Sequence, residues 1–109
     1  MKVTFLGTGT STGIPTIGVE RESCLSSDKR DNRLRSSILI EYKSKSILID
    51  CGPDFRQQML RINKTKVDAI FFTHEHADHT AGLDDIRPIS FHHGKIPIYA
   101  HQRVVDNLK

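Results

Sequence analysis

Residues 73–80, THEHADHT, place five ionisable side chains in six positions directly after an apolar run at residues 69–72. Crowding groups that compete for protons is unfavourable unless a cation compensates them. The H-x-H-x-D-H spacing therefore predicts a metal site. Its expected ligands are His74, His76, Asp78 and His79.

The spacing within this segment divides the four expected ligands between two metal ions. His74 and His76 are separated by one residue, so their imidazoles project to the same side of an extended backbone. Asp78 and His79 follow where the chain turns, which places them for a second ion. Neutral imidazole with a single carboxylate suits divalent metals such as Zn²⁺ or Mn²⁺. Because two such ions can bridge one water and lower its pKa towards neutrality, the segment predicts hydrolytic chemistry with two zinc or manganese ions as cofactors.

The rest of the chain alternates between strand and helix patterns, and these elements position the histidine segment. Strands are expected at residues 2–6, 36–42, 46–50, 67–73 and 97–100, with residues 43–45 as a hairpin turn. Helices are expected at residues 53–62, 81–86 and 102–108, with Pro88 interrupting the second. The apolar run at residues 67–73 is typical of a strand covered on both faces. The histidine segment therefore follows a strand's carboxyl end, where open α/β sheets place their sites.

Two loops flank these elements. Residues 7–15, GTGTSTGIP, lack the Lys-Ser/Thr of a Walker A loop, and Thr12 and Pro15 exclude the dinucleotide fingerprint. Residues 19–35 are expected to form an extended surface loop. Its basic cluster at residues 29–35 is either a solvated loop or a feature that attracts an anionic substrate such as a phosphate ester. Neither interpretation requires nucleic acid.

The bulk composition is that of one small globular domain. The 109 residues are 37% hydrophobic and 27% charged, which excludes a disordered chain and leaves room for one modest core. Two cysteines are too few for a disulfide framework. The apolar run after Lys2 is too short for a signal peptide or a membrane span, so a cytoplasmic location without membrane contact is expected.

The histidine motif, together with residues 49–52 (IDCG), resembles the metallo-β-lactamase superfamily. Further stretches at residues 5–11, 33–37, 50–56 and 82–88 are similar to the branch that contains phosphoribosyl 1,2-cyclic phosphate phosphodiesterases. The resemblance implies an α/β fold (α+β in some schemes), the metallo-β-lactamase αββα sandwich. Residues 1–109 would supply its amino-terminal half, one mixed sheet with flanking helices, and the downstream half would be absent.

The resemblance also implies a reaction. Members of this branch hydrolyse phosphodiesters, so the expected substrate is a small anionic phosphodiester similar to a cyclic phosphate. A metal-bridging hydroxide would attack phosphorus, and Asp78 would orient it as the catalytic residue. Asp50 would support the ligand loop from behind, by accepting hydrogen bonds from ligand residues. Substrate-binding residues are not indicated.

Two other functions remain open. A tRNA 3′-processing endonuclease of the same superfamily resembles this chain at its Gly-rich start and its metal motif, although long RNA would require a basic exosite that these residues do not show. The other is a non-catalytic metal-binding or assembly fragment, because half a site can hold metal without turnover. Nucleic acid is therefore a less favoured partner than a small substrate.

The chain departs from the family at two places. Where relatives often carry three cysteines for a structural zinc, this chain has Val19, Arg21 and Cys24, so we expect no such zinc. The family's downstream ligands are also absent, and four later candidates do not sit where the family places them: His92, His93, His101 and Asp106. We therefore expect the 109-residue chain alone to be inactive. Its uncovered sheet face is expected to drive self-association, with a homodimer as the simplest form.

Overall fold

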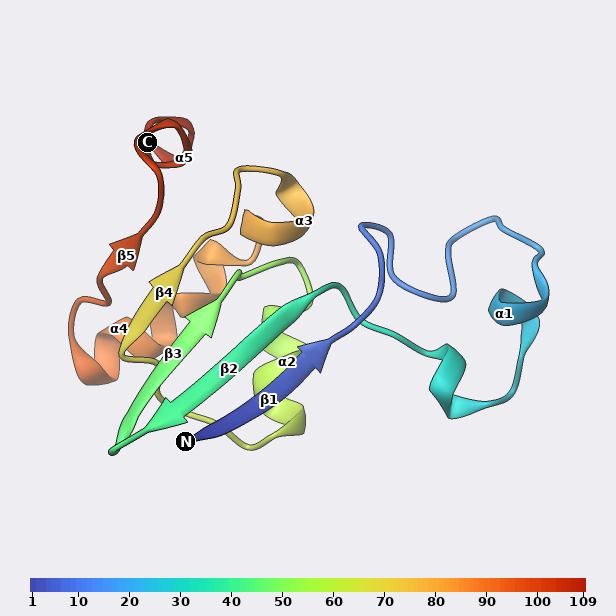
Figure 1. The fold of residues 1–109 in the computed structure, drawn as a ribbon, viewed down its shortest axis with the longest axis horizontal. Coiled ribbons are helices and arrows are strands. Elements are labelled where there is room, and N and C mark those ends of the chain that lie inside the picture. The colour runs from blue at the N-terminus through green and yellow to red at the C-terminus, as the bar shows by residue number, and fades with distance from the viewer.

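The computed structural model describes residues 1–109 and contains one five-stranded sheet in the order β1-β2-β3-β4-β5 (Figure 1). The strands are β1 (Lys2–Gly7), β2 (Ser37–Tyr42), β3 (Lys45–Ile49), β4 (Ala69–Phe71) and β5 (Ile98–Tyr99). Strands β1, β2 and β3 pair antiparallel, whereas β3, β4 and β5 pair parallel. The expected mixed sheet is therefore confirmed.

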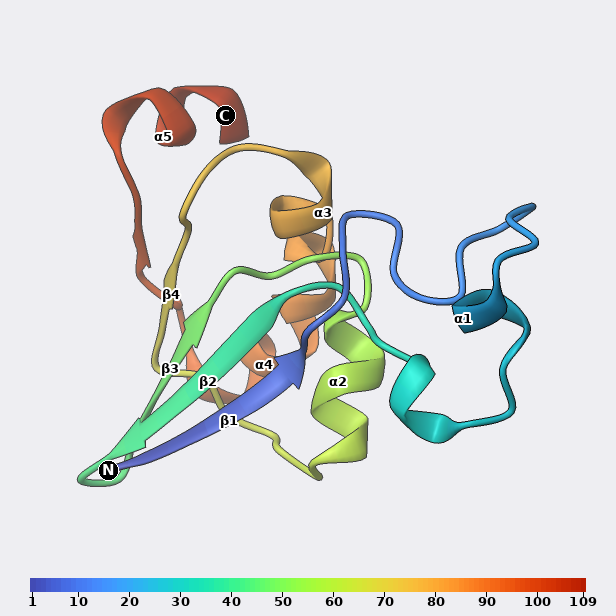
Figure 2. The same cartoon turned by 45° about the vertical axis from the view of Figure 1, so that its right-hand side comes forward.

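Helices lie on one face of this sheet and beyond its end. They are α1 (Glu22–Leu25), η1 (Lys29–Asp31), α2 (Phe55–Arg61), α3 (Ala77–Thr80), η2 (Leu83–Ile86), α4 (Arg87–His93) and α5 (Gln102–Leu108). Helices α2 and α4 lie on the same face, and α5 lies past the end of β5 (Figures 1 and 2). None of these helices has the length and apolar character needed to cross a bilayer.

The core lies between the sheet and α2. Leu39, Leu48 and Ile70, from the three central strands, are fully buried. Phe55 and Met59, one helical turn apart on α2, belong to the same cluster. Burial of such a side chain contributes about 1.5–3 kcal/mol, so this face supplies most of the apolar stabilisation of the fold.

The opposite face of the sheet is apolar but uncovered. The strand register aligns one row of side chains across all five strands: Phe5, Ile38, Ile49, Phe71 and Tyr99. The two ends of this row are exposed, with Phe5 64% and Tyr99 51% accessible. The rings of Phe71 and Tyr99 stack with their centroids 4.8 Å apart. This row, together with Val3, is named the open face below, and it has the composition of a surface that another layer covers.

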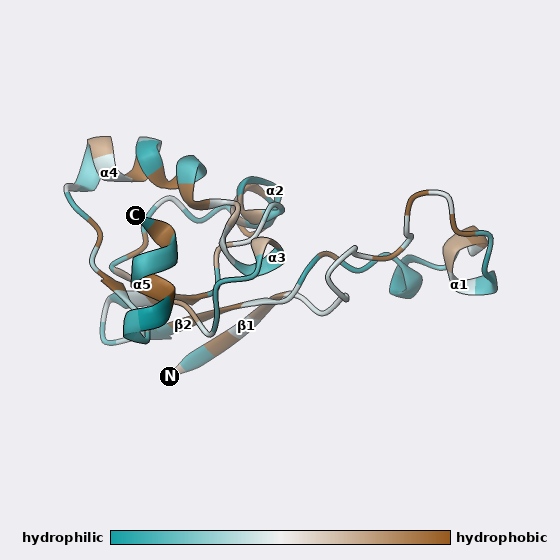
Figure 3. Cartoon of the chain, turned by 90° about the horizontal axis from the view of Figure 1, so that it is seen from above, coloured by the Kyte–Doolittle hydropathy of each residue, from teal (hydrophilic) through white to brown (hydrophobic).

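A long loop forms an arm that projects from the sheet. Residues 10–34 leave the end of β1 and return to the start of β2 (Figures 1 and 3). At its base, Ile14 and Arg33 exchange backbone hydrogen bonds of 2.9 and 2.8 Å. Further out, Ile17 is 100% and Leu25 71% exposed. The expected extended surface loop is confirmed, with α1 and η1 as its only helical turns.

Two helix predictions were wrong in their limits. The helix expected from residue 53 begins at Phe55, and the carboxylate of Asp54, which precedes it, accepts hydrogen bonds from Arg35 rather than capping the helix. The interruption expected at Pro88 does not occur, and η2 continues into α4. Pro88 lies in the first turn of α4, where a missing N–H group costs nothing, so it helps to begin that helix.

Candidate metal centre

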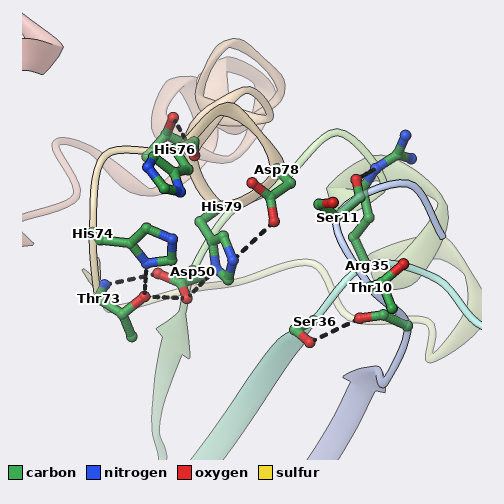
Figure 4. A network of polar contacts seen from close by, with 12 residues as sticks. Thr10, Ser11, Arg35, Ser36, Asp50, Thr73, His74, His76, Asp78 and His79 are labelled. Carbon is green, nitrogen blue, oxygen red and sulfur yellow. Dashed lines mark hydrogen bonds and ion pairs between the residues drawn. The ribbon is translucent and has the colours of Figure 1, made fainter.

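The histidine segment lies at the carboxyl end of β4, beside the end of β3. These two strands are parallel, so their carboxyl ends meet at the same edge of the sheet. Asp50 follows β3, and Thr73 lies two residues beyond β4 (Figure 4). The histidine segment therefore follows a strand's carboxyl end, as expected.

Asp50 is the buried centre of this region. Its carboxylate accepts three hydrogen bonds: from the backbone N–H of Thr73 at 2.8 Å, from the Thr73 hydroxyl at 2.7 Å, and from Nδ1 of His79 at 2.7 Å. Only 4% of the residue is exposed. Its φ of +62° lies in the left-handed region, which Asp tolerates better than most residues. Three donors offset the cost of burying this charge, so Asp50 fixes the loop that carries the histidines.

The backbones of the two loops are joined by close contacts. The N–H of Cys51 donates to His79 O and the N–H of Gly82 donates to Cys51 O, both at 2.9 Å. A Cβ on Gly52 would lie 2.2 Å from Asp78 O, and a Cβ on Gly82 would lie 2.0 Å from Gly52 O. Both positions therefore require glycine. This long-range contact has no signal in the local sequence.

The structure brings the four expected metal ligands side by side. The ring centroids of His74 and His76 are 4.7 Å apart, and those of His74 and His79 are 4.1 Å apart. The Asp78 carboxylate lies 2.9 Å from Nε2 of His79. Figure 4 shows the three rings above Asp50, with Asp78 beside His79. Nitrogen and oxygen donors thus gather at one edge of the sheet.

The hydrogen bonding of His79 fits a cation between its ring and Asp78. A carboxylate accepts only, so Nδ1 of His79 donates to Asp50 and, in the neutral ring, Nε2 carries a lone pair. That lone pair then faces the Asp78 carboxylate at 2.9 Å, which is favourable only with a proton or a metal ion between them. The donor set, three imidazoles and one carboxylate, suits zinc or manganese. Within this chain no three or more such groups are arranged to hold an ion by themselves, so the set is partial.

The later histidines lie in ordinary helix positions. His92 and His93 are exposed in the last turn of α4. His101 precedes α5, where its Nδ1 accepts a hydrogen bond from the backbone N–H of Arg103 at 3.2 Å. Asp106, also exposed, accepts a hydrogen bond from Gln102 at 2.9 Å. None of these side chains forms a hydrogen bond or ion pair with the histidine segment.

Two arginines of the basic cluster hold the base of the arm. Arg35 donates to Ser11 O at 2.8 Å and lies 3.1 Å from the carboxylate of Asp54. Arg33 donates to the Thr8 hydroxyl at 3.2 Å. Together with Arg61 they line a cleft of about 490 Å³. The cluster is therefore partly structural, and it also lines a basic concave surface.

Sequence reasoning missed two contacts of the histidine segment. Thr73 reaches back to Asp50, and its hydroxyl also lies 2.9 Å from Nδ1 of His74. Glu75, a spacer in the motif, pairs with Arg103 of α5 at 3.2 Å. The pKa of Glu75 is lowered, first by a hydrogen bond from its own backbone N–H and then by Arg103. Asp50 and Arg103, the partners in these contacts, both lie far from the motif in sequence. The spacing within the motif therefore could not indicate them.

The comparison with protein families matches the part of the chain that carries this site. Residues 45–109 fit the family described as the beta-lactamase superfamily domain, and they include Asp50 and all four expected ligands. The chain belongs to the beta-lactamase superfamily. The expected family is thereby confirmed, and the sheet with its flanking helices is part of the metallo-β-lactamase fold.

Three relatives of this superfamily member share most of its length. A diphosphatase from the PhnP family is 50% identical, with a TM-score of 0.94 over 98% of this chain and 44% of its own. An octanoyltransferase from Porphyromonas gingivalis is 47% identical over 100% of this chain and 22% of its own length. A ribonuclease Z from Methanococcus maripaludis is 33% identical over 90% of this chain and 28% of its own length. The chain thus spans less than half of each relative.

Proposed function

We propose that this superfamily member supplies the metal-binding part of a divalent-metal-dependent hydrolase that cleaves a small phosphodiester similar to a cyclic phosphate. The observation that carries the proposal is His79, held by Asp50 on one side and facing Asp78 on the other. Two relatives support it, since a diphosphatase and a ribonuclease are both named for cleaving phosphorus–oxygen bonds.

Each residue of the site has a role in this proposal. His74 and His76 would hold one ion, and Asp78 and His79 a second. When bound, the ions would act as Lewis acids on water and on the phosphate. Asp50 keeps the His79 ring in one orientation through its 2.7 Å hydrogen bond. One oxygen of Asp78 faces His79, and the carboxylate would accept a hydrogen bond from the attacking water and so orient it.

The remaining ligands and the group that protonates the leaving oxygen would come from outside residues 1–109. In this proposal the chain is one part of a single metallo-β-lactamase-like domain. The partial ligand set explains why we expect the 109-residue chain alone to bind metal but to show almost no turnover.

A tRNA 3′-processing endonuclease is the second candidate, because the ribonuclease Z relative is 33% identical. We favour the small substrate, because the arginines gather around one cleft of about 490 Å³ rather than along an extended surface. Long RNA is held by extended basic surfaces that neutralise several phosphates at once. A cleft of this size is in the range of sites for small molecules.

Acyl transfer is not proposed for this chain. The octanoyltransferase matches it over only 22% of that protein's length. A thiol nucleophile would need to be accessible and easily ionised. Cys51, the thiol beside Asp50, is fully buried, and burial raises its pKa to about 12.

Hydrolysis of bis-p-nitrophenyl phosphate with added Mn²⁺ or Zn²⁺ tests the proposal. The assay compares this chain with a longer polypeptide of the length of its relatives. We expect turnover by the longer polypeptide only, and its loss in the Asp78→Asn variant. Preferential cleavage of a precursor tRNA would favour the endonuclease, whereas bound metal without turnover of either substrate would make the protein a non-catalytic metal-binding module.

A further inference from the structure

The hydroxyl of Thr73 lies between Asp50 and His74. Its oxygen is 2.7 Å from Oδ2 of Asp50 and 2.9 Å from Nδ1 of His74 (Figure 4). The backbone N–H of Thr73 donates to the other oxygen of the same carboxylate at 2.8 Å. Main chain and side chain of Thr73 are thus both held by Asp50, and a β-branched side chain has few rotamers in which to leave it.

The number of protons on the Thr73 hydroxyl fixes which group donates in each of these hydrogen bonds. A threonine hydroxyl has one proton, and here it is donated to Asp50. The hydroxyl oxygen can then only accept from His74, so Nδ1 of His74 carries a hydrogen and, in the neutral ring, Nε2 carries the lone pair. His79 has the same arrangement, because its Nδ1 donates directly to Asp50. Both rings therefore turn Nδ1 towards the same carboxylate, and Nε2 remains for a metal ion.

We propose that Thr73 is a positioning residue, which extends the orienting effect of Asp50 to His74. One buried carboxylate then sets the tautomer of two rings, His79 directly and His74 through the Thr73 hydroxyl. This inference rests on the proposed function only in taking metal ions as the groups that the two rings face. Since His74 and His79 were assigned to different ions, Asp50 and Thr73 would couple the two halves of the centre.

Two substitutions of Thr73 distinguish the effect of its hydroxyl group from the effect of its branched shape. Thr73→Val keeps the branched shape and removes the hydroxyl, whereas Thr73→Ser keeps the hydroxyl and removes a methyl group. Thr73 is exposed, so neither change disturbs the core. Thr73→Ala serves as a second variant without the hydroxyl if the valine variant fails to give a native circular dichroism spectrum.

Ring nitrogen shifts from ¹⁵N NMR of the metal-free chain test the inference without metal or activity. We expect Nδ1 of both His74 and His79 to carry a hydrogen in this chain, because Nδ1 of His74 faces the Thr73 hydroxyl and Nδ1 of His79 faces Asp50. In Thr73→Val, His74 should shift towards the Nε2–H tautomer while His79 stays unchanged, and Thr73→Ser should resemble the parent. An unchanged His74 tautomer in Thr73→Val, or an Nε2–H tautomer in the parent, would overturn the proposal.

Competition with a chromophoric chelator for Zn²⁺ gives the second readout. We expect Thr73→Val to weaken zinc binding about ten-fold, and Thr73→Ser to stay close to the parent. Equal zinc affinity in all three proteins would overturn the coupling of Thr73 to the metal. Absence of zinc binding by the parent would instead refute the proposed function, and the NMR experiment would still decide the role of Thr73.

Discussion

Both faces of the sheet carry apolar side chains, but they differ in what covers them. Ile70 and Phe71 are neighbours on β4 and point to opposite faces. Ile70 is fully buried under the helices, whereas Phe71 is 39% exposed on the open face. A strand with apolar side chains on both faces is typical of a sheet between two layers. The sheet of this chain is therefore suited to a covering layer on each face, and residues 1–109 supply only the helical layer.

We propose that the open face drives self-association of the 109-residue chain, with a homodimer as the simplest form. The row from Phe5 to Tyr99 offers exposed aromatic groups at both ends. Such groups are typical of the buried centres of protein interfaces. In a longer polypeptide this face would be covered by the additional layer, and association would be lost.

The largest expected effect comes from truncating the neighbouring pair on β4. Ile70→Ala leaves a cavity in the core and should cost about 2–5 kcal/mol of the free energy of unfolding. Phe71→Ala loses a partly exposed ring and its stacking on Tyr99, so it should cost about 1 kcal/mol. Urea denaturation of both variants measures the difference. Equal losses would show that the two faces are covered to the same extent.

Removing the charge of Asp50, at the carboxyl end of β3, should have the next largest effect on stability. In Asp50→Asn the amide NH₂ group cannot accept the hydrogen bonds that one carboxylate oxygen now receives. We expect a loss of about 1.5–3 kcal/mol in stability, measured by denaturation. Asp78→Asn is the matched control, because its carboxylate pairs with His79 alone and removal of its charge should leave stability nearly unchanged. Similar losses in both variants would contradict a structural role specific to Asp50.

Polar substitutions on the open face test whether this face, rather than the helical layer, forms the interface. Phe5→Ser combined with Phe71→Ser should weaken self-association at least about ten-fold, because each exposed ring contributes on the order of 1 kcal/mol. Sedimentation velocity over a concentration series measures this change. Leu60→Ser with Phe91→Ser is the control, since these exposed side chains lie on the helical layer. Dissociation by the control pair alone would place the interface on the helices instead.

The smallest effect concerns the two thiols. Burial, with smaller contributions from Asp85 and Asp50, raises the pKa of Cys51 to about 12, so almost none of it is thiolate near neutral pH. Iodoacetamide should therefore modify Cys24, on the arm, much faster than Cys51. The native state holds the Cys51 proton more tightly than the unfolded chain does, so stability should fall as pH rises from about 9 towards 12. Equal alkylation of both thiols, followed by mass spectrometry, would contradict the burial of Cys51.

The local pattern of the sequence was enough to predict the strands, the hairpin and the grouping of the four expected ligands. Apolar alternation and the H-x-H-x-D-H spacing are local signals, and the structure keeps them together. The local pattern could not predict contacts between segments that are distant in sequence. The Gly52 and Gly82 contact and the Arg35 pairing with Asp54 depend on how two loops meet. Local preference also failed at Pro88, because the same residue ends one helix or begins another according to its neighbours.

Zinc titration of the metal-free chain, followed by calorimetry, tests directly whether residues 74–79 hold metal. The triple variant His74→Ala, His76→Ala, His79→Ala is the control. We expect saturable binding of up to two ions per chain and a rise in melting temperature, both lost in the variant. Binding that is absent in the parent, or unchanged in the variant, would contradict the claim that residues 74–79 hold divalent metal.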